Sequence, residues 1–188
     1  MNEARVGDFV EACITHPDEA RRLFAADPTL LQGTWAGDPL LHWFVIEDFQ
    51  AAAGLLLEFG FPVDARDEDE RTALHCACLL GRLGIVRMLL KLGADANAPH
   101  EPIWVNPLHI AVGNGHADIT ILLLEYGARV DYFVAGYQSI FSALQHVSES
   151  ERPMFVQLLA RHGVTREGLF EQHRMGELHD SPEQAFGW

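Results

Sequence analysis

Apolar residues recur along the chain in short helical blocks that end at glycine. In residues 72–98, "TALHCACLLGRLGIVRMLLKLGADANA", the spacing predicts a first helix over residues 73–80 and a second over residues 83–92. Thr72 is a typical helix N-cap, and Gly93 falls where a helix ends in a left-handed turn. Because neither short helix buries its apolar face alone, the pattern predicts packing against neighbouring units.

The block repeats at a nearly fixed interval. The interval from His75 to His109 equals the interval from Gly93 to Gly127. Upstream, the interval from His42 to His75 is one residue shorter than the interval from His75 to His109. A fixed period in this range indicates stacked supersecondary units, so the repeat has to be considered before any catalytic motif.

The segments "TALHCA" and "GADANA" resemble the ankyrin repeat, whose consensus reads T-P-L-H-x-A, then G-H, then L-L-x-x-G-A-D-V-N. The resemblance is strong over residues 39–131 and weaker outside them. It implies an all-α solenoid of about five stacked helix pairs, with finger-like loops and divergent terminal caps.

The chain is expected to form a single ankyrin-repeat domain over residues 1–188. Within it we expect an N-terminal capping repeat, three central repeats, one divergent repeat, and a C-terminal helix with a tail. Their predicted ranges are, in that order, 1–37, 38–70, 71–104, 105–135, 136–165 and 166–188.

The composition suits a folded soluble protein, since 48% of the 188 residues are hydrophobic. No apolar run is long enough to cross a bilayer, and the N-terminal segment lacks the features of a secretory signal. Three cysteines give no disulfide framework, which fits a reducing compartment. We expect a cytoplasmic location, with a nuclear one still open.

Acidic residues dominate the charge balance, with 27 Asp and Glu against 13 Lys and Arg and a net charge of −14. The excess of acids is concentrated in residues 1–70, which contain few Lys or Arg side chains. A field of this sign repels nucleic acid and anionic membranes and would steer a basic protein surface toward the N-terminal half. Alternatively, the acidic surface only keeps the protein soluble.

The recurring histidine looks reactive, but a catalytic residue is expected once rather than three times. The ankyrin resemblance implies a structural role, in which the imidazole hydrogen-bonds the cap of its own unit and the backbone of an adjoining loop. Thr72 supplies the cap in one unit, and Pro39 and Asn106 stand there in the others. The residues assigned structural roles are His42, Thr72, His75, Gly93, His109 and Gly127.

Enzyme and metal signatures are missing from the sequence. Cys76 and Cys78 are two positions apart on a predicted helix and point to nearly opposite faces, so together they do not grip one ion. We expect Cys78 in the core and Cys76 toward the concave face. No G-x-S-x-G elbow, phosphate-binding loop or H-E-x-x-H motif occurs. The chain is therefore expected to have no catalytic activity, cofactor or metal.

The resemblance implies that partners bind at the loop tips and on the exposed side of each first helix. The predicted module is a monomer that recognises a protein partner and inhibits it or acts as a scaffold. Two loops, "PHEPIWVN" and "VDYFVAGY", are unusually aromatic, which favours binding, although the first loop has the alternative of folding back onto its neighbour. The predicted partner-binding residues are Trp35, Trp43, Glu47, Glu68, Asp69, Arg71, Leu79, Leu80, Ile103, Trp104, Asn114, Tyr132, Phe133 and Tyr137.

Two other hypotheses stay open at the level of sequence. Residues 132–188, where the repeat pattern decays, contain His146, His162, His173 and His179 and would be the place for a ligand-binding, metal-binding or catalytic role. Asn97 matches the position that asparaginyl hydroxylases modify in ankyrin repeats, so the chain is also a candidate substrate.

Overall fold

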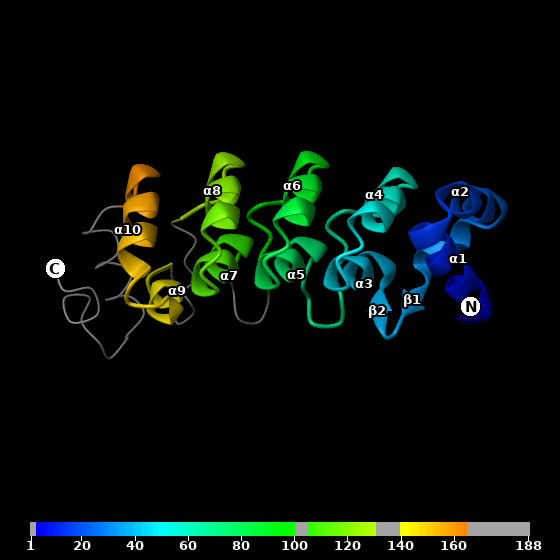
Figure 1. Cartoon of the computed structure of the whole chain (residues 1–188), viewed down its shortest axis with the longest axis horizontal. Coiled ribbons are helices and arrows are strands. Elements are labelled where there is room, and N and C mark those ends of the chain that lie inside the picture. The colour runs from blue at the N-terminus through cyan, green and yellow to red at the C-terminus, as the bar shows by residue number, and fades with distance from the viewer. Residues whose placement is uncertain (1–2, 101–104, 131–139, 165–188) are drawn as a thin grey trace. The chain divides into compact units, whose positions relative to one another are not determined.

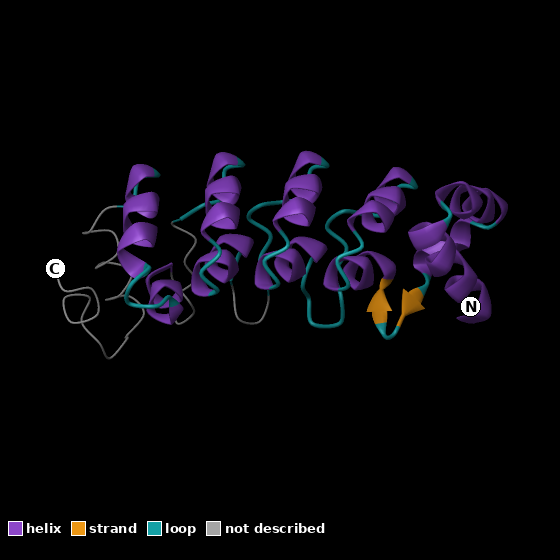
Figure 2. Ribbon diagram, viewed as in Figure 1, coloured by secondary structure: helices purple, strands orange, loops and turns teal. Residues whose placement is uncertain are grey.

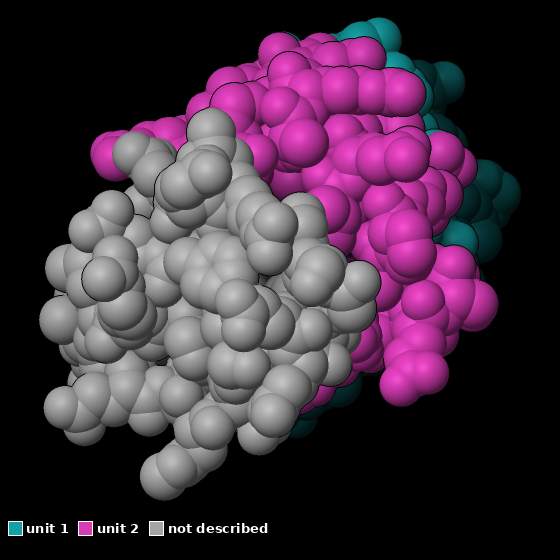
Figure 3. Space-filling model, turned by 90° about the vertical axis from the view of Figure 1, so that its left-hand side faces the viewer, with its two compact units in different colours: residues 1–94 teal, residues 95–188 magenta. Residues whose placement is uncertain are grey.

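The computed structural model confirms the predicted all-α fold of paired helices. It contains ten α-helices, one 3₁₀ helix and one small two-stranded sheet within the residues that it describes. The described residues are 3–100, 105–130 and 140–164. The chain divides into two compact units, residues 1–94 and 95–188, coloured separately in Figure 3 and described one at a time below.

The first unit begins with a helix pair, a 3₁₀ turn and a short hairpin, and continues with two further helix pairs (Figure 1). In chain order these elements are α1 (Glu3–Thr15), α2 (Pro17–Ala26), η1 (Pro28–Gln32), β1 (Thr34–Trp35), β2 (Asp38–Pro39), α3 (Leu40–Ile46), α4 (Gln50–Glu58), α5 (Ala73–Leu79) and α6 (Leu83–Lys91).

The core of the first unit lies between successive helix pairs, because each short helix is apolar on the side that meets its neighbour. Helix α3 packs against α5, and α4 packs against α1 and α6. The large side chains that are fully buried there include Phe9, Phe44, Leu56, Leu74 and Ile85. As the sequence predicts, the unit is stabilised by contacts between repeats rather than within a single helix.

A short β-hairpin precedes α3, where the sequence predicts no strand. Trp35 pairs with Asp38 across a two-residue turn formed by Ala36 and Gly37 (Figure 2). Both turn residues have positive φ, 55° and 95°, which is the mark of the tight type I′ hairpin turn. The Trp35 indole lies over Gly7 of α1, where an added Cβ would stand 3.1 Å from the ring. The hairpin is thereby packed onto the N-terminal repeat.

The second unit contains four described helices. These are α7 (Pro107–Gly113), α8 (Ala117–Glu125), α9 (Ile140–His146) and α10 (Arg152–Arg161). Helix α7 packs against both α8 and α9, and the fully buried side chains include Leu108, Ile119 and Phe155. In both units, no helix among the described residues has the length and apolar composition needed to cross a bilayer.

The turn between the two helices of a repeat uses a left-handed residue. Gly81 and Gly115 occupy it with φ of 70° and 73°. Asp48 occupies the same position one repeat earlier with φ of 64°, which costs a residue with a Cβ about 1 kcal/mol. The Asp48 carboxylate in turn accepts a hydrogen bond from Arg82 at 3.1 Å. The side chain thus links the ends of α3 and α5.

Candidate partner-binding surface

The three recurring histidines are buried at the starts of α3, α5 and α7. Their ring nitrogens form hydrogen bonds with backbone groups or with the side chain that caps the helix. His42 Nε2 donates to the Arg71 carbonyl oxygen at 2.9 Å, so it joins α3 to the following finger. His75 Nδ1 accepts from the backbone N–H of Thr72 at 3.1 Å and forms a capping box with it. The rings are therefore held as parts of the scaffold.

The third histidine uses a different cap. His109 Nδ1 donates to the Asn106 side-chain oxygen at 2.6 Å, and the Asn106 amide nitrogen donates onward to the Arg129 carbonyl at 3.1 Å. Asn106 thus caps its own helix and also reaches the next loop. Burial lowers the pKa of His109 to about 4, so this ring stays neutral at physiological pH.

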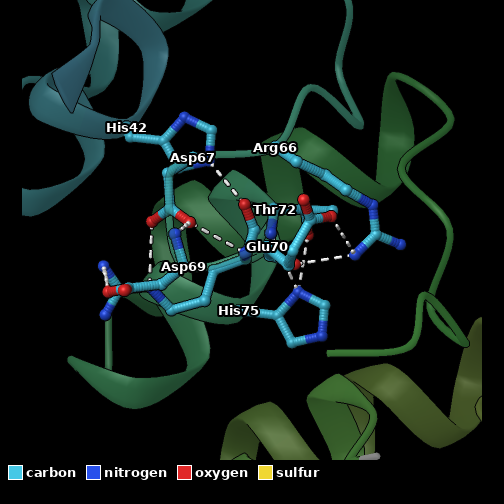
Figure 4. A network of polar contacts seen from close by, with 8 residues as sticks. His42, Arg66, Asp67, Asp69, Glu70, Thr72 and His75 are labelled. Atoms are coloured by element: carbon cyan, nitrogen blue, oxygen red, sulfur yellow. Dashed lines mark hydrogen bonds and ion pairs between the residues drawn. The ribbon is translucent and has the colours of Figure 1, made fainter. Parts of the chain in front are cut away.

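The finger between the second and third repeats is organised around Asp67 (Figure 4). This carboxylate is buried and accepts from the backbone N–H groups of Asp69 and Arg71 at 3.0 and 2.8 Å. It also accepts from the Arg71 Nε at 2.8 Å. Burial opposes its ionisation, but the hydrogen bonds from Arg71 outweigh that effect and hold the pKa of Asp67 below its ordinary value.

Two of the predicted binding residues are committed to this finger. The guanidinium of Arg71 pairs with Asp69 at 2.9 Å as well as with Asp67, and its pKa is raised by these partners although burial acts against it. Glu68 lies between them and is exposed. The tip therefore presents Glu68 and Asp69 to solvent on a rigid loop.

The predicted aromatic residues of the second repeat form a cluster. Trp35 and Trp43 lie edge to face with ring centroids 6.4 Å apart. Trp43 also contacts Phe44 and Phe49 at 5.4 and 5.7 Å. Both tryptophans are half-buried, so each contributes to packing and still offers part of its surface to solvent.

At the end of α5 the structure exposes a pair of leucines. Leu79 and Leu80 are 44% and 42% exposed, in contrast to the buried residues that precede them on the same helix. Glu47 stands at the equivalent position at the end of α3 and is also exposed. Because α3 and α5 pack side by side, these three side chains belong to neighbouring helix ends.

Of the remaining predicted residues, three are described by the structure and the aromatic-loop residues are not. In the second unit, Asn114 is exposed and its amide donates to the Ile110 carbonyl at 2.8 Å, while Gly127 ends α8 with φ of 82°. Gly93 ends α6 in the same way, with φ of 91°. The aromatic-loop residues lie outside the described residues: Ile103, Trp104, Tyr132, Phe133 and Tyr137.

The cysteines are buried rather than presented to solvent. Cys76, expected toward the concave face, is only 3% exposed and Cys78 is fully buried. Burial raises the pKa of Cys76 to about 11 and of Cys13 to about 12. Within residues 3–100, 105–130 and 140–164, no three His, Cys, Asp or Glu side chains are grouped as metal ligands.

The hypothesis of a histidine site near the C-terminus stays a prediction. His146 and His162 are exposed in the described part of the second unit. His173 and His179 lie outside the described residues.

Three polar residues have roles in the scaffold that the sequence did not predict, although Asn106 was already expected at a cap position. Asp67 organises its finger, and Asn106 replaces a threonine cap while adding a bond to the next loop. Asn97 spans two loops, since its amide donates to the Gly127 carbonyl at 3.1 Å and its oxygen accepts from the Arg129 N–H at 2.7 Å. Their position in turns could have predicted these roles, because Asn and Asp side chains often hydrogen-bond nearby backbone groups there.

These features define a class of protein: each unit is built of paired helices, and buried histidines together with asparagines hold its loops in place. Comparison with known families is consistent with that class. The family model of ankyrin repeats in three copies matches residues 9–100, and a second model of ankyrin repeats in many copies matches residues 77–124. The chain belongs to the ankyrin-repeat family.

Several curated proteins are similar to this chain. The E3 ubiquitin-protein ligase XBAT33 of Arabidopsis thaliana is 32% identical over 168 residues, covering 88% of this chain and 31% of the relative. The 26S proteasome non-ATPase regulatory subunit 10 of Dictyostelium discoideum is 33% identical over 92 residues, covering 48% and 39%.

Human protein phosphatase 1 regulatory subunit 27 is 46% identical over 59 residues, covering 31% of this chain and 38% of the relative. The chain thus spans less than half the length of each of these three relatives. Its family and these regulatory relatives support a protein-interaction module.

Proposed function

We propose that the chain is a non-catalytic module that recognises a protein partner through the ends of its first helices and its loop fingers. The observation that carries this proposal is the adjacent pair Leu79 and Leu80 at the C-terminal end of α5, which are 44% and 42% exposed. Single exposed leucines are ordinary on protein surfaces, whereas exposed apolar side chains that lie next to one another often mark interaction sites.

Exposed acidic residues among the predicted binding positions favour a partner with a basic surface. Glu47 is exposed at the end of α3, and Glu68 and Asp69 are exposed at the finger tip. The hydrogen bonds to Asp67 fix the finger before a partner binds, so little conformational entropy is lost on binding. Opposite charges would mainly raise the association rate and select the partner.

The proposed role is to inhibit or to scaffold that partner. Two of the similar proteins are regulatory subunits by name, one of the proteasome and one of protein phosphatase 1. A rigid surface that covers part of an enzyme could either inhibit it or hold it in a complex. The activity of the captured partner, measured with and without the chain, would distinguish inhibition from scaffolding.

Affinity capture from lysate of the source organism tests the proposal. Wild type is compared with Leu79→Ser/Leu80→Ser and with the matched control Leu92→Ser, which alters a leucine that is 53% exposed at the end of α6. We expect a protein that wild type and the control retain and the double variant loses. Equal recovery by wild type and both variants would place binding elsewhere or show that the capture is non-specific.

A further inference from the structure

Two indole rings are in contact where the hairpin joins α3, and the sequence places Asp38 and Glu47 on the same elements. Trp35 and Trp43 are in edge-to-face contact, with an angle of 78° between the rings. Asp38 is the cross-strand partner of Trp35, so their side chains lie on the same face of the hairpin. Glu47 follows Trp43 by one helical turn and shares its side of α3. We name these four residues the indole–carboxylate site.

The rings of the indole–carboxylate site are fixed before any ligand arrives. Trp35 is seated on Gly7 of α1, which leaves room for the indole because it has no Cβ. Trp43 is braced from the other side by Phe44 and Phe49. Packing of this kind explains why two large aromatic residues stand here, and it leaves them only half-buried.

Packing does not explain the two carboxylates. Asp38 is half-buried and Glu47 is exposed, and within the described residues neither has an ion pair or a side-chain hydrogen bond. Two other acids of the same unit have basic partners: Asp48 pairs with Arg82, and Asp67 with Arg71. Among the described residues, Asp38 therefore brings to the hairpin a charge without a basic partner, at the position across from Trp35.

The field of Asp38 reaches the interior of the first unit. Its negative charge acts to raise the pKa of His42 and of Cys76, although burial remains the largest influence on both groups. In His42 burial prevails and the pKa is lowered.

Indole faces attract cations, and a carboxylate beside the ring adds a second attraction. We infer that the indole–carboxylate site accepts a lysine or arginine side chain of the protein partner, an assignment that rests on the proposed function. The half-buried rings exclude water from one side of the cation, and Asp38 and Glu47 supply the opposite charge. The site thereby specifies a basic residue at one point of the partner's surface.

The test uses the whole chain labelled with ¹⁵N and short, capped, glycine-rich peptides. Two peptides carry a central lysine or arginine, and their neutral counterparts carry norleucine or citrulline. The readout is the indole N–H signals of Trp35 and Trp43, assigned with Trp35→Phe and Trp43→Phe. We expect the cationic peptides to shift both signals in a saturable way and the neutral peptides to leave them unchanged.

Charge variants separate this site from the general acidity of the chain. Asp38→Asn/Glu47→Gln should weaken binding of the lysine and arginine peptides by about fivefold or more. The matched control Asp8→Asn/Glu11→Gln removes two exposed acids of α1 and should change binding by less than about twofold. Neither double variant removes a buried apolar group, so both should fold, which circular dichroism checks.

Equal shifts with the neutral peptides, no shift with the cationic ones, or equal weakening by both double variants would overturn the inference. Any of these results leaves the proposed function standing as long as capture of a protein still depends on Leu79 and Leu80. Loss of that dependence together with intact lysine binding would instead overturn the proposed function alone. The two failures are therefore distinguishable.

Discussion

The Nε2 atom of His42 lies 2.9 Å from the carbonyl oxygen of Arg71, although the two residues are far apart in the sequence. The bond joins the first helix of one repeat to the base of the next finger. The side chain of the same Arg71 is held by Asp67 at 2.8 Å. Arg71 thus accepts a hydrogen bond from His42 at its carbonyl and donates one to Asp67 from its side chain, so the position of the finger depends on the core histidine.

Replacing His42 should destabilise the first unit. His42 is fully buried, so His42→Ala removes a hydrogen bond and leaves a cavity, and the free energy of unfolding should fall by about 2 to 4 kcal/mol. Urea unfolding followed by circular dichroism measures the change. His16→Ala, at an exposed position, is the control and should have little effect. Equal effects of the two substitutions would contradict the role of the buried bond.

Stability should fall in mild acid because of His109. Its pKa is about 4 in the folded chain and is ordinarily 6.5, so the unfolded chain binds the proton first as the pH falls. The contribution is complete above pH 6.5, declines as the pH falls toward 4, and amounts to roughly 3 kcal/mol in full.

Unfolding free energies measured by urea titration between about pH 8 and about pH 4.5 test this dependence. His109→Gln keeps an N–H donor for Asn106 but does not titrate, so its curve should be flatter than that of wild type. Parallel curves for the two proteins would show that His109 does not cause the acid sensitivity.

The hairpin turn offers a stabilising substitution. Ala36 has φ of 55°, a conformation that Asn tolerates and that a β-branched residue strongly disfavours. Ala36→Asn should raise the free energy of unfolding by about 0.5 to 1 kcal/mol, and Ala36→Val should lower it. Thermal and urea unfolding give the order of the three proteins, and a Val variant as stable as the Asn variant would argue against the turn geometry.

The thiols should be inert in the folded chain. Burial raises the pKa of Cys76 to about 11 and of Cys13 to about 12, and Cys78 is fully buried. At about pH 8 a thiol-specific reagent should label the native protein slowly and all three cysteines quickly in urea. Fast labelling of one thiol without denaturant would show that its helix pair opens locally.

The helix pairs could be predicted from the sequence because they depend on local spacing and on a fixed period. His75 and His109 mark equivalent positions in successive repeats, and the interval between them defines the repeat without any knowledge of contacts. The hairpin at Trp35 and Asp38 was missed because its two-residue strands are too short for an alternating pattern, although Ala36-Gly37 is a plausible turn.

The candidate surface was less predictable because it depends on contacts that the spacing of residues does not reveal. Whether Trp43 is exposed depends on which rings surround it, and the role of Asp67 depends on backbone N–H groups that the turn brings together. The sequence suggests Leu79 and Leu80 because they lie at the end of a first helix, and the structure supplies their exposure. Their part in binding stays a prediction.

Site-specific photo-crosslinking tests the central claim most directly. Leu80→p-benzoylphenylalanine places a crosslinker at the end of α5, and Leu92→p-benzoylphenylalanine places one at an exposed leucine of α6. The account predicts a crosslinked protein partner in the source organism from position 80 and none from position 92. A partner crosslinked only from position 92, or from neither position, would contradict it.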